Sequence, residues 1–353
     1  MDVNQFDFEL PPECIALRPV VPRHASRLLQ LKAGQISDHV FTDLPALLRA
    51  GDVLVLNETK VLPASLKGVR PARPHGGGGD VEIGFNLHKQ ISADTWRAFT
   101  RPARRLRAGD IVHFGRDLRA TILDKQDGGD VGLKFNCFGP DLQNAIEALG
   151  QMPLPPYIAR KRPVDARDIE DYQTLYARES GSVAAPTAGL HFTPEVFAGL
   201  KAVGVKLARL TLHVGAGTFL PVSAPDTRDH RMHSEWYSIS RETAALVNAA
   251  SSAGGRIVPV GTTALRALES ATDAQGRLRY GAAETAIFIT PGYRFKLVDA
   301  LVSNFHLPKS TLFMLVSALC GLDNMKQAYQ HAIENGYRFY SYGDASLLWK
   351  NNE

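Results

Sequence analysis

Cysteine is scarce in this sequence of 353 residues. Its three cysteines, Cys14, Cys137 and Cys320, are odd in number and far apart, and no Cys-x-x-Cys motif is present. A disulfide framework or a cysteine-bound zinc site is therefore not expected, and a reducing compartment fits best. The first ten residues carry acidic side chains where a signal peptide would carry positive charge. We therefore expect a cytoplasmic protein.

Long hydrophobic runs and an excess of one charge are lacking as well. The longest uncharged apolar run, Ser310 to Leu322, is too short for a bilayer, which needs ~20 residues, and it predicts a buried helix. The 40 Lys and Arg residues oppose 36 Asp and Glu residues, which leaves a net charge of +4. This balance excludes a histone-like composition but permits a local basic patch. The length indicates two domains of roughly 150 residues each.

The motifs of common nucleotide-binding and hydrolytic enzymes are absent: there is no GxGxxG, GxxxxGK[ST], HExxH or GxSxG. The nearest match, His213–Leu220, ends in leucine where the third glycine is needed. The spacing of His230, His233 and Glu235 resembles a metal-ligand cluster, but no second His or Cys cluster completes it. We therefore expect no metal site, and we favour an acid–base role for this segment.

Secondary-structure signals divide the chain into an α/β part and a β-rich insert. Val53–Leu56 is a continuous apolar run, which is typical of a strand buried on both faces. From Pro63 to about Gly139, short β-rich runs alternate with turns, the pattern of a small barrel or sandwich. After Thr187, helices and strands alternate, which indicates a largely parallel sheet.

These signals predict an α/β fold, a three-layer sandwich with a mostly parallel sheet, interrupted by an inserted small antiparallel β-barrel domain. The discontinuous α/β catalytic domain should cover residues 1–60 plus 156–353, and the barrel residues 61–155. Among the elements expected in the second α/β part are the strands Val205–His213, Ile257–Val260, Ile287–Thr290 and Tyr337–Tyr342.

Three segments could let a ligand approach the backbone closely. Ala184–Phe192 is rich in small residues and precedes a helix start, although taken alone this segment favours a tight turn with a solvated histidine. Val214–Thr218 is a glycine-rich turn after a predicted strand, where open α/β sheets bind ligands, or else an ordinary loop. Gly261–Thr263 opens a helix whose N–H groups suit a carboxylate, or it is only a threonine N-cap.

Basic residues gather in three places despite the small net charge. Arg97, Arg101, Arg104, Arg105 and Arg107 lie within eleven residues that contain no acid. The other two clusters are Arg160, Lys161 and Arg162, and Arg18, Arg23, His24 and Arg27. A single run would favour a solvated face, but three clusters favour a phosphate backbone and hence a nucleic acid.

Nine segments, taken in order, closely resemble the S-adenosylmethionine:tRNA ribosyltransferase-isomerases of queuosine biosynthesis, the QueA family. The resemblance spans nearly the whole chain. The segments are Phe6–Pro11, Gly51–Asn57, Ala184–Phe192, His213–Pro221, Met232–Glu235, Gly261–Glu269, Thr290–Tyr293, Asn304–Thr311 and Tyr329–Asp344. Glu58 and Lys60 stand where the family often has Asp and Arg, so the charge types are kept.

The resemblance implies the same α/β sandwich interrupted by a small β-barrel. It also implies transfer and isomerisation of the ribosyl group of S-adenosylmethionine. The acceptor would be the aminomethyl group of a 7-deazaguanine base at the tRNA wobble position. The products would be epoxyqueuosine-tRNA, adenine and methionine. S-adenosylmethionine is then a consumed substrate, so no cofactor is expected, and neither a membrane nor an obligate protein partner is implied.

This chemistry sets the roles that residues must fill. A sulfonium acidifies the adjacent C5′–H, so a base must accept that proton, and an acid should protonate the departing adenine. The candidates for catalysis are His191, His213, Glu235 and His306. We favour His191 as the base, because it precedes a helix start whose dipole should keep its imidazole neutral. His213 is its rival.

The remaining expected sites are binding sites. S-adenosylmethionine should contact Thr187, Gly189, Gly215, Gly217, Thr218, Thr262, Thr263 and Arg266. The tRNA should contact Arg23, Arg101, Arg104, Arg105, Arg160, Lys161 and Lys309. Two other functions stay open at this point: an S-adenosylmethionine-dependent RNA methyltransferase and a non-catalytic RNA-binding protein.

Overall fold

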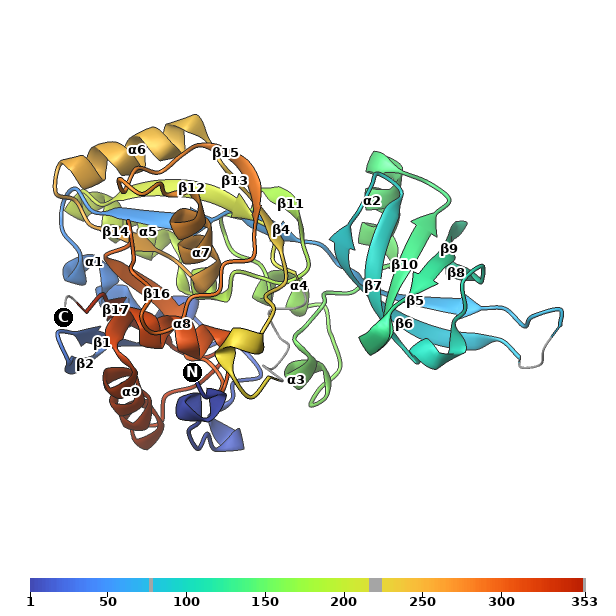
Figure 1. Ribbon diagram of the computed structural model, residues 1–353, viewed down its shortest axis with the longest axis horizontal. Coiled ribbons are helices and arrows are strands. Elements are labelled where there is room, and N and C mark those ends of the chain that lie inside the picture. Colours follow the sequence, from blue (N-terminus) through green and yellow to red (C-terminus); the bar gives the residue numbers. More distant parts are fainter. Residues whose placement is uncertain (76–78, 216–223, 352–353) are drawn as a thin grey trace. The chain divides into compact units, whose positions relative to one another are not determined.

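The computed structural model describes residues 1–75, 79–215 and 224–351 (Figure 1). The chain divides into two compact units. The first comprises residues 1–59, 173–179 and 185–353, and the second comprises residues 60–172 and 180–184. Each unit has its own sheets and its own buried core, so the two are described in turn.

A five-stranded sheet lies at the centre of the first unit. Its strand order is β14 (Ile257–Pro259), β3 (Val53–Asn57), β12 (Lys206–Leu212), β13 (Glu235–Ile239) and β15 (Gly281–Thr285). The first three strands are parallel, with Val53 aligned to both Lys206 and Ile257. All five residues of β3 are buried, as the apolar run predicts.

A second sheet of four strands has the order β16 (Ala300–Asn304), β17 (Ala345–Trp349), β1 (Arg27–Lys32) and β2 (Gln35–Val40). Only the β1–β17 pair is parallel. A parallel bridge between Val260 and Val302 links β14 to β16. The α/β class is confirmed, but both sheets are mixed, whereas the sequence predicted a mostly parallel sheet. The reason is that β2 pairs antiparallel with β1, β13 with β12, and β15 with β13, so each sheet contains both orientations.

Three helices of the first unit begin or end at residues that are typical of helix termini. Ser240 accepts a hydrogen bond from the amide of Thr243 at 3.1 Å, and Ser310 accepts one from Phe313 at 3.1 Å. Gly204 ends its helix in the left-handed region, with φ of 85°. The helices are α1 (Leu44–Leu47), α5 (Pro194–Val203), α6 (Arg241–Ser252), α7 (Thr262–Ala271), α8 (Thr311–Cys320) and α9 (Leu322–Glu334).

Helices pack on both sheets of this unit. The longer helix α6 runs beside β12, whereas α8 packs against β17 and α9 (Figure 1). The core between the elements is apolar and fully buried, with Leu54, Leu200, Val258, Val302 and Leu347 in one cluster. Short 3-10 helices cover Val3–Phe6, Pro12–Cys14, Arg23–Ala25, Phe41–Asp43, Thr187–His191 and Thr227–Asp229.

Two of the expected strands are wrong. The segment Ile287–Thr290 is irregular, and the strand at that point of the sheet is β15. Tyr337–Tyr342 is also not a strand, because its aromatic rings fill the core as a turning segment: Phe339 lies 4.9 Å from Phe305 between ring centroids. The last strand instead begins at Ala345.

The second unit is built around a closed antiparallel barrel of six strands, as the sequence predicted. Alternate side chains of β6, including Ile83, Phe85 and Leu87, are buried inside the barrel. The strand order is β10 (Asp130–Phe135), β7 (Thr95–Arg101), β6 (Val81–Gln90), β5 (Ser65–Arg70), β8 (Ile111–Gly115) and β9 (Leu118–Lys125).

The other elements of the chain are short. The helices of the second unit are α2 (Gly139–Leu149), α3 (Pro156–Ala159) and α4 (Asp168–Asp171), with 3-10 turns at Ala103–Arg105 and Asp127–Gly129. The strands β4 (Thr59–Val61) and β11 (Glu179–Ser182) pair as a two-stranded sheet. No helix in the described part of the chain is long and apolar enough to span a membrane.

Candidate active site

The carboxyl ends of the parallel strands β3, β12 and β14 meet at one edge of the five-stranded sheet. Asn57, the last residue of β3, connects the ends of β3 and β12 and the start of α7. Its side-chain amide donates to the carbonyl of Leu212 at 2.9 Å and lies 3.5 Å from the hydroxyl of Thr263, and its Oδ1 accepts from the Leu212 amide at 2.9 Å. In open α/β sheets this edge is where ligands bind.

A cleft of about 420 Å³ lies at the end of β12. This volume falls within the ~300–1,000 Å³ typical of small-molecule sites. Its walls carry two acids, two arginines and an indole that is 40% exposed, a mixture suited to a charged, partly aromatic ligand. The lining residues are Glu58, Arg178, Glu179, Arg209, Leu210, Thr211, His213, Trp236, Ser238, Ser240 and Thr243.

His213 lines this cleft with one ring nitrogen engaged. Its ring stacks on Trp236 at 5.0 Å between centroids, and its Nδ1 lies 2.9 Å from the hydroxyl of Thr59. The Thr59 hydroxyl donates its proton to the carbonyl of Glu179 at 3.4 Å, so it accepts from Nδ1–H. Nε2 therefore keeps its lone pair. Burial lowers the pKa of His213, which favours this neutral form.

Glu58 contributes a carboxyl group to the same cleft. The sequence reasoning gave it no role, although it directly follows the buried strand β3, which is the signal that could have found it. Its side chain is 18% exposed, and its Oε2 lies 3.9 Å from Nη1 of Arg209. Burial raises the pKa of Glu58 despite the opposing charges of Arg209 and Arg178.

Two predicted site residues, Glu235 and Arg266, lie together as a buried ion pair. The guanidinium of Arg266 donates through Nη1 to Oε2 of Glu235, and its Nε donates to the carbonyl of Ile287 at 3.2 Å. The other carboxylate oxygen of Glu235 accepts from the amide of Gly215 at 3.1 Å. This pair joins β13 to helix α7 and fixes the start of the glycine turn after β12.

His191 lies in a different part of the unit, within a chain of buried hydrogen bonds. Thr187 donates to Oδ1 of Asn304 at 2.8 Å, and the Asn304 amide lies 3.2 Å from Nε2 of His191. The other ring nitrogen lies 2.8 Å from the hydroxyl of Ser26. The Asn304 amide can only donate, so Nε2 accepts and Nδ1 carries the proton.

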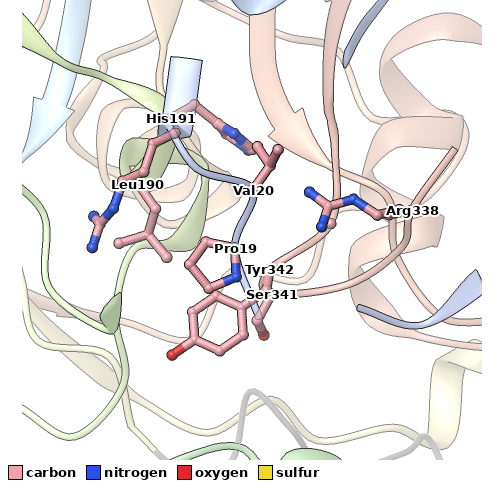
Figure 2. A pocket seen from close by; sticks show the side chains of 9 residues that line it. Pro19, Val20, Leu190, His191, Arg338, Ser341 and Tyr342 are labelled. Atoms are coloured by element: carbon pink, nitrogen blue, oxygen red, sulfur yellow. The ribbon is translucent and has the colours of Figure 1, made fainter. Parts of the chain in front are cut away.

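The surroundings of His191 leave little space. The adjoining cavity, lined by Arg23 and Arg338 among others, has a volume of about 10 Å³, roughly that of one water molecule (Figure 2). Burial, followed by the charges of Arg338 and Arg23, lowers the pKa of His191 to about 3. The imidazole is thus neutral, as predicted, but the main cause is burial and not a helix dipole.

His306 is the last predicted catalytic histidine. It is buried, its Nε2 lies 2.9 Å from the hydroxyl of Ser303, and its backbone amide donates to the hydroxyl of Tyr329 at 2.9 Å. Burial lowers its pKa to about 3. His306, shortly after β16, and His191, the last residue of the 3-10 helix Thr187–His191, are therefore packed, neutral histidines.

The two predicted ligand-contact glycines that the structure describes differ in their surroundings. A Cβ on Gly189 would lie 2.0 Å from the hydroxyl oxygen of Tyr176, so close packing of this tyrosine requires glycine there. A Cβ on Gly215 would meet no atom of the described residues within 4 Å, so none of them obstructs a ligand at this backbone position. Gly217 and Thr218 lie outside the described residues.

Thr262 and Thr263 form the buried first turn of α7, beside Asn57. The N–H groups at a helix start favour a negatively charged ligand group. Within the described ranges, no group of three or more His, Cys, Asp and Glu side chains is placed to hold a metal ion. Metal-ligand chemistry therefore has no candidate among these residues.

The predicted tRNA-binding residues fall into two groups. Arg101, Arg104 and Arg105 are exposed and form no ion pair with any residue that the structure describes, and Arg160 and Lys161 are exposed as well. Their neighbour Arg97 differs because it pairs with Asp124 at 3.1 Å and with Asp130 at 3.0 Å.

The other two predicted tRNA contacts already have protein partners. Arg23 is half-buried and donates to the carbonyl of Gln173 at 3.0 Å. Lys309 forms an ion pair with Asp7 at 2.9 Å.

A sequence model of the family described as Queuosine biosynthesis protein matches residues 3–348 of this chain. This chain belongs to that family. The S-adenosylmethionine:tRNA ribosyltransferase-isomerase of Maricaulis maris is 60% identical over 349 residues, which are 99% of each protein. The protein of the same name from Mesorhizobium japonicum is 57% identical over 99% of this chain and 98% of its own length.

A solved structure is also similar to this chain over nearly its full length. The crystal structure of S-adenosylmethionine tRNA ribosyltransferase from Thermotoga maritima is 35% identical to this chain, with a TM-score of 0.54. The match covers 97% of this chain and 99% of that one. The likeness therefore includes both the sheets of the first unit and the barrel of the second.

Proposed function

We propose that this protein transfers and isomerises the ribosyl moiety of S-adenosylmethionine onto tRNA. The acceptor is the aminomethyl group of 7-aminomethyl-7-deazaguanine at the wobble position, and the products are epoxyqueuosine-tRNA, adenine and methionine. The observation that carries the proposal is the identity of 60% and 57%, over nearly full length, to two proteins named for this activity.

The cleft at the end of β12 is the site that we assign to S-adenosylmethionine. Its exposed indole, Trp236, suits a sulfonium, because cations are attracted to the face of an aromatic ring. His213 supplies the base that removes the C5′ proton, since its Nε2 has a lone pair and no hydrogen-bond partner among the described residues.

We favour His213 over His191 as the base because a substrate can reach its ring. Both ring nitrogens of His191 are already hydrogen-bonded to Ser26 and Asn304, and the space beside it holds about one water molecule. We assign His191, His306, Thr187 and Gly189 to the support of the fold around the site. Glu235 and Arg266 position the turn at Gly215.

The methionine carboxylate of the donor is assigned to the start of α7. The first-turn N–H groups at Thr262 and Thr263 supply partial positive charge for it. We also assign Gly215, Gly217 and Thr218 to the binding of the donor. In support of this, no atom of the described residues lies close enough to a Cβ placed on Gly215 to obstruct a ligand there.

The tRNA is assigned chiefly to the exposed basic residues of the second unit, Arg101, Arg104, Arg105, Arg160 and Lys161. We regard the barrel as a domain inserted at residues 61–155 and the first unit as a three-layer sandwich. Since tRNA is the substrate, the activity belongs in the cytoplasm. Arg23 and Lys309 contribute less to tRNA binding, because each already has a protein partner.

One experiment tests the function directly. The purified protein is incubated with S-adenosylmethionine and with tRNA that carries the 7-deazaguanine precursor, and the small products are separated by chromatography. Adenine and methionine in equal amounts are the expected products. S-adenosylhomocysteine would instead indicate a methyltransferase, and no turnover would indicate an RNA-binding protein without catalysis.

A further inference from the structure

Glu58 carries a buried carboxyl oxygen without a hydrogen-bond partner. Its Oε2 is shielded from solvent, and no described residue donates a hydrogen bond to it. Its side chain nevertheless lines the 420 Å³ cleft that also contains His213. Leaving a buried polar atom without a partner costs free energy, so its persistence at a cleft wall indicates a partner supplied by a ligand.

The groups that face Glu58 determine its charge. Arg209 lies 3.9 Å from Oε2, and Arg178, Glu179 and His213 lie in the same cleft. Burial raises the pKa of Glu58 and outweighs the lowering effects of Arg209 and Arg178, while Glu179 raises it further. A larger fraction of Glu58 is therefore protonated near neutral pH than of an exposed glutamate. In its protonated form the carboxyl group is a hydrogen-bond donor.

We propose that Glu58 is the catalytic acid that protonates the departing adenine. This assignment rests on the proposed function and names a residue that the ribosyl transfer otherwise lacks. The C1′–N9 bond breaks and its electron pair stays on adenine, while the proton of the Glu58 carboxyl group moves to the adenine ring. The electron pair released when His213 removes the C5′ proton forms a C4′=C5′ double bond as the C4′–O4′ bond breaks, and the pair from that bond forms C1′=O4′ as adenine leaves.

The positions of Glu58 and His213 fit their roles as acid and base. Glu58 follows β3 and His213 follows β12, two adjacent parallel strands, so both side chains project from the same edge of the sheet. After the transfer, Glu58 is a carboxylate beside the guanidinium of Arg209, which stabilises the new charge. Solvent then returns the proton before the next turnover.

The test separates proton removal at C5′ from adenine release. Glu58→Gln keeps the size of the side chain but has no proton to transfer. In deuterium oxide, this variant should still exchange the C5′ proton of S-adenosylmethionine at the wild-type rate or faster. Its release of adenine in a single turnover should fall by ~100- to 10,000-fold. Glu334→Gln, an exposed glutamate on α9, makes the same charge change outside the cleft and should behave as wild type.

Two further measurements complete the design. Glu58→Asp should recover part of the lost adenine release, because aspartate restores a transferable proton. The wild-type rate of adenine release should decline as pH rises and Glu58 loses its proton, and this decline should be absent in Glu58→Gln.

Each outcome decides between stated alternatives. If Glu58→Gln releases adenine within a few-fold of wild type, or loses C5′ exchange and adenine release together, the assignment of Glu58 as the acid is wrong. If the wild-type protein produces no adenine, the proposed function itself fails, and this result is distinguishable because it does not depend on any variant. Loss of S-adenosylmethionine binding in Glu58→Gln would also overturn the assignment, since it would make Glu58 a binding residue.

Discussion

The guanidinium of Arg266 and the carboxylate of Glu235 form an ion pair in the protein interior, with side-chain exposures of only 5% and 4%. Each partner compensates a charge that would otherwise be costly to bury. Glu235→Ala leaves the Arg266 charge buried without its carboxylate, so the free energy of unfolding in urea should fall by ~3–5 kcal/mol.

A matched control is available for this prediction. Glu334 is an exposed glutamate on α9, so Glu334→Ala should change the free energy of unfolding by no more than about 0.5 kcal/mol. A loss below about 1 kcal/mol in Glu235→Ala would mean that solvent reaches Arg266 and that the pair is not as buried as its exposure indicates.

Gly189 should tolerate no side chain, because its neighbour is the hydroxyl of Tyr176. A Cβ would lie 2.0 Å from that oxygen and 2.9 Å from the ring carbon that bears it. Gly189→Ala should destabilise the protein by ~1–3 kcal/mol in urea denaturation. Adding Tyr176→Phe removes the closest atom, so the double variant should recover part of this loss.

The comparison position for Gly189 is Gly215. No atom in the described part of the chain lies within 4 Å of a Cβ placed there, so Gly215→Ala should change stability by less than about 1 kcal/mol. If Tyr176→Phe gives no recovery in the Gly189→Ala background, the contact with Tyr176 is not what requires glycine.

Local patterns in the sequence predicted much of the fold. The apolar run of β3, the alternation in β6 and the glycine that ends α5 each depend on residues close together in the chain. The aromatic segment Tyr337–Tyr342 misled the prediction, because large rings occur both in strands and in packed turns. Which strands of a sheet run parallel depends on long-range connections, which local periodicity does not record.

The candidate site was predictable only in part, for the same reason. His191 and His213 both lie beside small residues in the sequence, so local patterns alone could not separate their roles. The structure separates them through residues that are distant in the sequence. Ser26 and Asn304, which are 165 and 113 residues from His191, form hydrogen bonds with its two ring nitrogens. Glu58 follows a buried strand, a local signal, but its burial in a cleft arises from the tertiary fold.

The buried histidines should make stability depend on pH. Burial lowers the pKa of both His191 and His306 from 6.5 to about 3, so the unfolded chain binds protons that the folded chain does not. Their stabilising contribution is complete above pH 6.5 and is lost as pH falls from there towards 3. Each should make the free energy of unfolding fall by up to about 1.4 kcal/mol per pH unit.

Urea denaturation at several pH values between 4 and 7 measures this slope. His306→Gln removes one of the two groups, so its stability should decline with falling pH less steeply than that of wild type. An equal slope in the variant and in wild type would show that the pKa of His306 does not differ between the folded and unfolded states.

His213 should be essential for proton removal. His213→Ala should lower the rate constant of turnover by ~100- to 10,000-fold and abolish deuterium exchange at C5′, with S-adenosylmethionine binding largely retained. Because burial lowers the pKa of His213, the wild-type activity should lose this base only at pH values below 6.5. Thr59→Val should give a smaller loss, since it removes only the hydroxyl that orients Nδ1.

The assignment of the base is open to direct contradiction. If His213→Ala exchanges the C5′ proton within a few-fold of wild type, His213 is not the base, and His191 should be tested next. A change confined to the Michaelis constant would instead indicate that His213 only positions the donor.

The exposed arginines of the second unit should bind tRNA phosphates. Arg101, Arg104 and Arg105 have no ion-pair partner among the described residues, whereas Arg97 is held by Asp124 and Asp130 and is left out of the test. Replacing all three with alanine should weaken tRNA binding. The slope of log affinity against log salt concentration should become shallower by up to ~0.9 for each lost phosphate contact. Arg277→Ala, an exposed arginine outside the basic clusters, should leave the slope unchanged, and an unchanged slope in the triple variant would mean that these arginines face only solvent.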